Sequence, residues 1–267
     1  MSTEWGTPFA VSPFFSFNDL CSNGIAKLPG AGRNLTPGDS RPQHSAQASD
    51  LQRIERGILT IMGNDGHTAL LFQVEPALIP PCFTPLFSRG VQVSACLECS
   101  LKELMCQQIG LAEDYLENRV QTVFLNGHPV DDVNQATVGE GAIVALSAAM
   151  PGLAGAVLRK GGVLATLRKN ITYRNDASAR ETCEGKVIVK LFNMTTREVG
   201  PLLLARGIWM EGAELRELLD RCEDPFKKGC RRVILGNNPI GLEDLRSRIK
   251  DKDTLFLQVV TEGTSKK

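Results

Sequence analysis

One pattern occurs twice in this chain, and the repetition limits the folds open to it. Residues 120–146 hold an apolar run, an Asn-Gly turn, a Pro-Val step, a polar stretch and a second apolar run. Residues 231–257 hold equivalent pieces in the same order. An apolar run leading into Asn and Gly predicts a strand and a tight turn, because both residues tolerate a positive φ. Each copy is therefore expected to fold as strand, turn, short edge strand and closing strand.

The similarity continues upstream of both units. The matched segments are 69–74 with 187–192, 85–87 with 201–203, 89–91 with 206–208, and 100–104 with 214–218. Matched pieces in a fixed order, at a nearly constant offset, indicate a duplication. The alternative is that short strand and turn patterns recur by chance. We expect two related domains in tandem.

Composition suggests the boundaries of these domains. Residues 1–50 are rich in Ser, Pro, Gly, Asn and Gln, and such a segment buries too little apolar area to offset its ordering entropy. They are predicted to form a tail, with docking of its phenylalanines on a partner or on the body as the alternative. The expected plan is a tail over 1–50, domains over 51–150 and 185–262, a linker over 151–184 and a tail over 263–267.

Local patterns predict the elements of the first domain. A hairpin is expected from 58–62 and 68–74, then a proline-rich loop over 77–85 and an alternating strand over 91–97. Ser100 and Glu103 have the spacing of a capping box, which predicts a helix over 101–108.

The second domain is expected to follow the same order. A strand is predicted over 186–192 and an apolar piece over 201–204. Residues 214–222 predict an amphipathic helix, because apolar side chains recur there at helical spacing. Residues 242–249 are expected to form a loop or a short helix.

Charge and hydropathy exclude several classes of protein. Thirty basic and thirty acidic residues cancel, which gives no global attraction to nucleic acid or to an anionic membrane. The sequence contains no long uncharged apolar run, so no transmembrane helix is predicted. The beginning of the chain lacks the basic residues of a secretory signal, so a cytoplasmic location with reduced thiols is expected.

Cys96 and Cys99 form a CxxC pair, with Cys106 seven residues further on. Thiolates at this spacing can share a zinc ion or form a redox pair. A structural zinc site needs four ligands, and the fourth could come only from elsewhere, such as Cys82 or His128. The competing interpretation is a set of ordinary buried thiols. We expect no cofactor, with zinc as the alternative.

Other candidate residues are isolated. His67 and His128 lie beside turns, and no nucleophile motif pairs either with a Ser, Cys or Asp, so no catalytic triad is predicted. The acidic pair Asp131-Asp132 could bind a cation but is typical of a solvated turn. No residue is assigned a catalytic role, and the protein is not expected to be an enzyme.

The motif VFLNGHPV at 123–130, followed by GEGAIVAL at 139–146, resembles the ubiquitin-like β-grasp proteins. The similarity is closest to the sulfur carriers of molybdopterin and thiamin synthesis. It covers residues 68–150 well and 186–260 more loosely. This resemblance implies an α+β fold of two tandem β-grasp domains, each a small mixed sheet with one main helix.

The chain departs from the carriers at its end. A sulfur carrier ends in Gly-Gly, whereas this chain ends in Gly263-Thr264-Ser265-Lys266-Lys267 and has Gly161-Gly162 in its interior. Carrier chemistry would require cleavage after Gly162. The alternative is that these two glycines form a turn.

The segment between the copies is locally basic. No acidic residue occurs between Met150 and Arg174, and five basic residues lie in 159–174. A phosphate-binding or acid-binding surface is one interpretation. A linker with solvated charges, whose apolar side packs on a neighbour, is the other.

These observations favour a non-enzymatic binding or scaffold protein that recognises a protein or a small ligand through sheet faces or exposed edges. The candidate binding residues are Asn126, Gly127 and His128 on the repeated turn. The alternative is a sulfur-handling, redox or metal-binding protein that uses Cys96, Cys99 and Cys106. Membrane and nucleic-acid partners are not expected.

Overall fold

A computed structural model of the chain describes residues 67–168, 170–173 and 183–261. All of them belong to the second of two compact units, Ile58–Lys267. The two expected tails and the first strand of the expected 58–62 hairpin lie outside the described residues. The domain boundaries therefore stay predictions.

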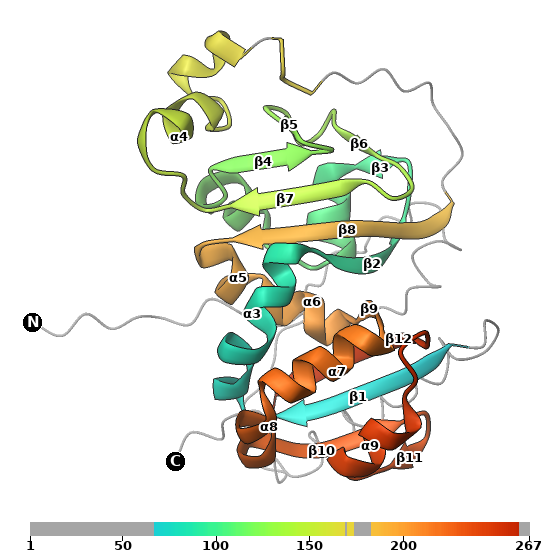
Figure 1. Cartoon of the computed structure of the whole chain (residues 1–267). Helices are drawn as coiled ribbons and strands as arrows, with labels where there is room; N and C mark the ends of the chain where they lie inside the picture. The colour runs from blue at the N-terminus through green and yellow to red at the C-terminus, as the bar shows by residue number, and fades with distance from the viewer. Residues whose placement is uncertain (1–66, 169, 174–182, 262–267) are drawn as a thin grey trace, which may run out of the picture. The chain divides into compact units, whose positions relative to one another are not determined.

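Twelve strands occur in the described part of the chain. They are β1 (Thr68–Val74), β2 (Val91–Cys96), β3 (Cys99–Ser100), β4 (Thr122–Leu125), β5 (His128–Pro129), β6 (Thr137–Val138), β7 (Ile143–Ser147), β8 (Glu184–Phe192), β9 (Ile208–Glu211), β10 (Cys230–Leu235), β11 (Asn238–Pro239) and β12 (Thr254–Thr261). Ten of them form one mixed sheet in the order β11-β10-β1-β12-β9-β2-β8-β7-β4-β5, and β3 pairs with β6 (Figure 1).

Helical segments connect these strands. They are η1 (Pro76–Leu78), α3 (Ile79–Arg89), η2 (Glu103–Gln108), η3 (Tyr115–Arg119), α4 (Gly152–Leu158), η4 (Val163–Arg168), α5 (Met194–Glu198), α6 (Gly200–Arg206), α7 (Gly212–Arg221), α8 (Glu223–Gly229) and α9 (Leu242–Arg248). The architecture is a mixed α/β fold with a large mixed sheet and several helices, which confirms the expected class in this coarse form. None of the described helices is long and apolar enough to cross a bilayer.

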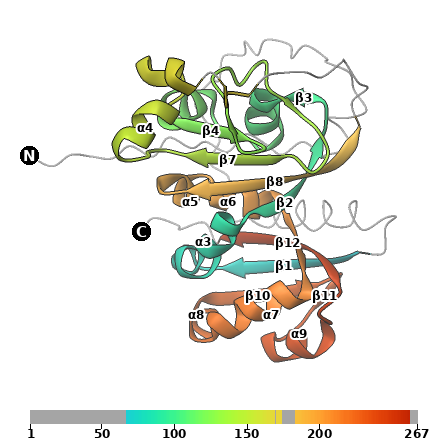
Figure 2. The ribbon, with the colours of Figure 1, turned by 45° about the horizontal axis from the view of Figure 1, so that its top comes forward.

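The first strands of the two sequence copies are exchanged across the sheet. β1 opens the first copy, yet it pairs antiparallel with β10 and parallel with β12 of the second copy. β8 opens the second copy, yet it lies between β2 and β7 of the first (Figure 2). We call β5, β4, β7, β8 and β2 the first half of the sheet, and the other five strands the second half.

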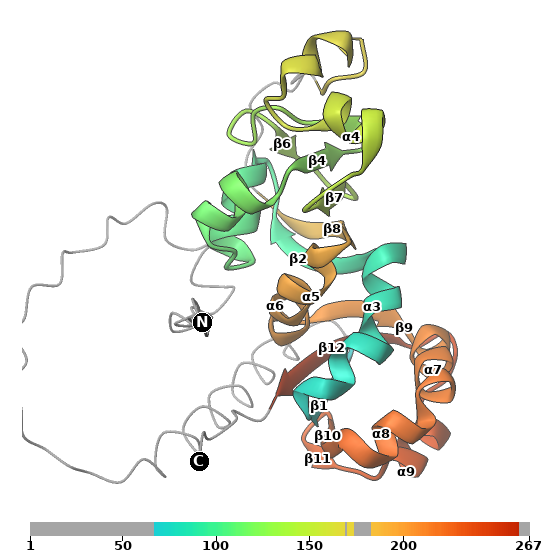
Figure 3. The same cartoon turned by 90° about the vertical axis from the view of Figure 1, so that its left-hand side faces the viewer.

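Crossover helices make this exchange possible. α3 leads from β1 in the second half to β2 in the first half, and α5 with α6 leads from β8 back to β9 (Figure 3). The two crossover helices pack closely on each other. A Cβ added to Gly200 of α6 would lie only 2.4 Å from the ring of Phe87 in α3. The two copies are therefore interlocked rather than placed side by side.

The expectation of a proline-rich loop over 77–85 is wrong, because these residues lie in η1 and α3. Pro80 and Pro81 fall in the first helical turn, where a missing N–H costs no hydrogen bond. Pro85 lies inside the helix and leaves the carbonyl of Pro81 without its helical donor. That oxygen lies 4.0 Å from Sγ of Cys222. The apolar piece expected over 201–204 is likewise part of the helix α6.

The predicted capping box is confirmed. The Ser100 N–H donates to the Glu103 carboxylate at 2.8 Å, and the Glu103 N–H donates to the Ser100 hydroxyl at 3.1 Å. The helix begins at Leu101, and Gly110 follows it with a φ of 86°. The amphipathic helix predicted over 214–222 is α7, whose apolar face is buried.

The repeated turns have the same pairing register, although Asn126 and Gly127 both have a positive φ whereas in the second turn Gly236 does and Asn237 does not. Phe124 pairs with Pro129 in β4–β5, and Ile234 pairs with Pro239 in β10–β11. After each turn an amide bonds back across the hairpin, from Val130 to Val123 and from Ile240 to Val233. The strand beside each hairpin differs, however, since β7 flanks β4 whereas β1 flanks β10.

Candidate functional site

The repeated turn holds its candidate residues for structural reasons. Asn126 and Gly127 have φ values of 51° and 82°, which is the left-handed geometry that the turn requires. The amide of Asn126 donates to the carbonyl of Ile143, and its side-chain oxygen accepts from the amide of Ile143 at 2.8 Å. Asn126 therefore fastens the hairpin to β7.

His128 lies on the edge strand β5 and contacts a later part of the chain. Its Nδ1 lies 3.1 Å from the carbonyl oxygen of Ile171, and the amide of Tyr173 donates to the carbonyl of Pro129. These contacts cover the edge of β5, so a binding role for Asn126, Gly127 and His128 stays a prediction.

The side chain of Gln108 contacts two of the three candidate cysteines, Cys96 and Cys99. The amide of Cys96 donates to the side-chain oxygen of Gln108 at 2.8 Å, and the side-chain nitrogen of Gln108 donates to the carbonyl of Cys96 and to Sγ of Cys99. Cys99 and Cys106 are free thiols, so the structure does not join Cys96 to Cys99.

Partial burial raises the pKa of Cys99 and of Cys106. Burial, together with the negative charge of Glu103, raises the pKa of Cys99 to about 11. Nucleophilic and metal-binding cysteines need a lowered pKa, because the thiolate is the reactive form. Within the described ranges, no three His, Cys, Asp or Glu side chains gather as a metal site.

The remaining candidates also have structural partners. His67 packs edge-on against Trp209, with ring centroids 4.9 Å apart. Asp131 accepts from the guanidinium of Arg168 at 2.5 Å and from the amide of Gly161 at 3.1 Å. Asp132 accepts from the amide of Asn134. Gly161-Gly162 forms a turn between α4 and η4.

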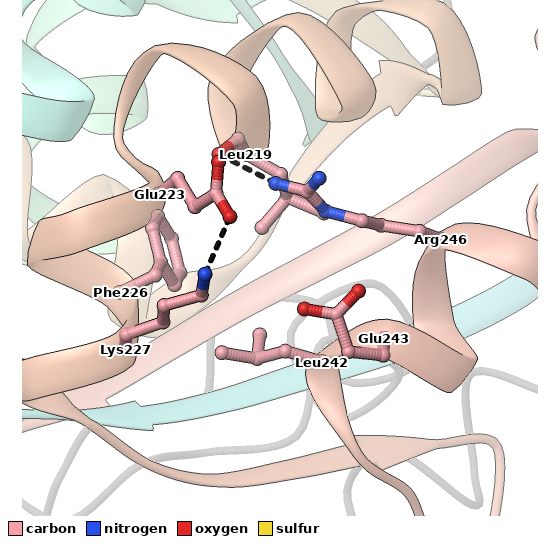
Figure 4. A pocket seen from close by; sticks show the side chains of 7 residues that line it. All are labelled: Leu219, Glu223, Phe226, Lys227, Leu242, Glu243 and Arg246. Atoms are coloured by element: carbon pink, nitrogen blue, oxygen red, sulfur yellow. Dashed lines mark hydrogen bonds and ion pairs between the residues drawn. The ribbon is translucent and has the colours of Figure 1, made fainter.

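A small depression lies between α7, α8 and α9 (Figure 4). Three of the four charged residues that line it, Glu223, Lys227 and Arg246, have polar partners. Lys227 bonds Glu223 at 2.5 Å, and Arg246 donates to the carbonyl of Leu219 at 3.1 Å. These pairings leave little charge for binding a ligand.

The first half of the sheet has a partly exposed face opposite its core. Phe124, Ala145 and Lys190 are neighbours across β4, β7 and β8, and Ile143 and Ile188 form the adjacent row. All five side chains are half-buried. We call these five residues the open face. Their strand neighbours Val144, Val189 and Leu146 are fully buried on the other side, where the helical segments between β2 and β4 pack (Figure 1).

The open face continues across the centre of the sheet. Gln92 of β2 pairs with Ile188 on one side and with Trp209 of β9 on the other. The ammonium of Lys186 lies 3.9 Å above the Trp209 ring, and the indole N–H donates to the Ser94 hydroxyl. Phe192, which is 39% exposed, ends the β8 row. The surface is therefore apolar with two lysines.

Sequence analysis did not identify this face. The alternation of Lys186, Ile188 and Lys190 with buried valines was visible within the predicted strand 186–192. The neighbours of that strand were not visible, because exchange brings β8 beside β2 and β7.

Comparison with protein-family models, curated proteins and solved structures finds no match.

Proposed function

We propose that this protein is a non-enzymatic binding module that recognises an acidic protein surface through the open face. The module consists of two β-grasp-like units that have exchanged their first strands. In each unit a parallel pair of strands lies at the centre, β7 with β8 and β12 with β1. In the first half, the capped helix after β2 covers one face. The central parallel pair and the capped helix of the first half support the resemblance to the β-grasp proteins, whereas in the second half β1, and not β12, lies beside the hairpin.

The open face is the observation that carries the functional proposal. An apolar row that crosses several strands and remains partly accessible is typical of a surface for a protein partner. Lys190 belongs to the open face and Lys186 lies on the same side of β8, so a partner with acidic side chains around an apolar centre would fit this surface. The raised pKa values of Cys99 and Cys106 disfavour thiolate chemistry at these two half-buried residues.

Site-specific photocrosslinking in the native host tests the proposal. We expect the full-length protein carrying p-benzoylphenylalanine at position 124 to give one discrete adduct. The replacement is aromatic for aromatic at a half-buried position, so the sheet should be retained. The same crosslinker at Lys228, an exposed residue of α8, should not give this adduct.

A second substitution shows whether the adduct depends on the face. Lys190→Glu reverses the charge in the row that holds Phe124 and Ala145 and should weaken the adduct at least about tenfold, whereas Lys228→Glu should leave it unchanged. Equal adducts at positions 124 and 228, or an adduct that survives Lys190→Glu, would contradict recognition by the open face.

A further inference from the structure

The segment between α4 and Tyr173 exposes its apolar side chains. Leu153 is 74% exposed, Val163 92%, Leu167 71% and Ile171 51%. The sequence-based expectation of a linker that packs its apolar side on a neighbour is therefore wrong at these positions. We call these four residues the apolar tip.

The buried side chain at the centre of this segment is that of a charged residue, Arg168, and not an apolar one. The Arg168 side chain is only 1% exposed, and its guanidinium pairs with Asp131 at 2.5 Å. It also donates to the carbonyl oxygens of Val157 and Arg159 and to the Thr172 hydroxyl. Arg168 thus joins α4, η4 and the following turn to the first half of the sheet. The exposed apolar residues are held in place by this pairing, because each contact of Arg168 fixes a different part of the segment.

The charge of this segment differs from that of the whole chain. The net charge of the chain is zero, which led to the expectation of no membrane partner. Residues 150–174 nevertheless contain five basic residues and no acidic one. Arg168 is neutralised by Asp131, but Arg159 is exposed next to the end of α4. Lys160 is half-buried and its ammonium donates to the carbonyl of Leu116, so Arg159 is the exposed basic residue in the described part of this segment.

We propose that the apolar tip inserts peripherally into an anionic lipid surface. Apolar side chains with basic neighbours are the composition of segments that lie at the boundary between headgroups and acyl chains. Basic residues near such a surface are attracted to anionic lipids. The helix α4 lies at the side of β4, at the outer end of the first half of the sheet (Figures 1 and 3). A protein partner would instead have to provide a pocket for each separate side chain.

Vesicle flotation of the full-length protein tests this proposal. The protein should float with vesicles of phosphatidylcholine mixed with phosphatidylglycerol and much less with phosphatidylcholine alone, and added salt should reduce flotation. The double variant Val163→Ser/Leu167→Ser removes two exposed apolar side chains without adding charge. We expect it to bind anionic vesicles at least about tenfold more weakly.

Met194→Ser is the matched control, because Met194 is a 44% exposed apolar residue outside the tip. It should float like the unmodified protein. The proposal is overturned if the protein does not float with anionic vesicles, which would leave an acidic protein as the occupant of the tip. It is also overturned if the double variant and Met194→Ser bind equally well. Neither result depends on the open face, so the two proposals can fail separately.

Discussion

At the scale of single residues, the environment decides whether a chemically suggestive side chain is functional. Asn126 belongs to the most distinctive motif of the sequence, yet both of its hydrogen bonds to Ile143 serve the hairpin. Cys99 belongs to a CxxC motif, yet burial and Glu103 oppose its ionisation. Sequence spacing could predict the turn and the thiol pair, but it could not predict the local solvation that determines reactivity.

The thiol of Cys99 should react slowly with alkylating agents. Its pKa of about 11 lies above the ordinary value of 9.0. At neutral pH the thiolate fraction should therefore be about 100-fold smaller than that of an ordinary thiol, and alkylation should accelerate as the pH rises toward 11. Peptide mass spectrometry after competitive alkylation measures this rate, with the exposed Cys183 as the internal reference. Alkylation of Cys99 as fast as that of Cys183 at neutral pH would restore the redox hypothesis.

At the scale of elements, the sequence predicted strands and capped helices better than crossovers. The 91–97 strand, the Ser100–Glu103 capping box and α7 follow from alternation, side-chain spacing and helical periodicity. The helix α3 was missed because three prolines indicate a loop, whereas two of them occupy the first turn. The duplication had already aligned 85–87 with 201–203, and the structure places both segments in crossover helices.

Close packing of the two crossovers can be tested at Gly200. In Gly200→Ala the new methyl would lie 2.4 Å from the ring of Phe87, which is fully buried and has little room to move. We expect a loss of about 1–3 kcal/mol in the free energy of unfolding, measured by urea denaturation. Gly139→Ala is the control, because its nearest neighbour would be 3.5 Å away. Equal stability of the two variants would show that α3 and α6 do not meet at this position.

At the scale of the whole molecule, strand exchange could not be predicted from the sequence. β1 and β8 are segments that the sequence comparison matched, and both are rich in apolar residues. Either strand could bury its alternate side chains beside β2, so local periodicity does not distinguish the two arrangements. The exchange also creates the open face, since it places Ile188 between Ile143 and Gln92.

Backbone nuclear Overhauser effects in the full-length protein test this exchange most directly. We expect cross-peaks that join Gln92 with Ile188 and Ser94 with Lys186, as the antiparallel β2–β8 register requires. Cross-peaks should also join Leu70 with Leu257 in the parallel β1–β12 pair. Cross-peaks between β2 and β1, in place of those between β2 and β8, would show two separate units and contradict the interlocked sheet.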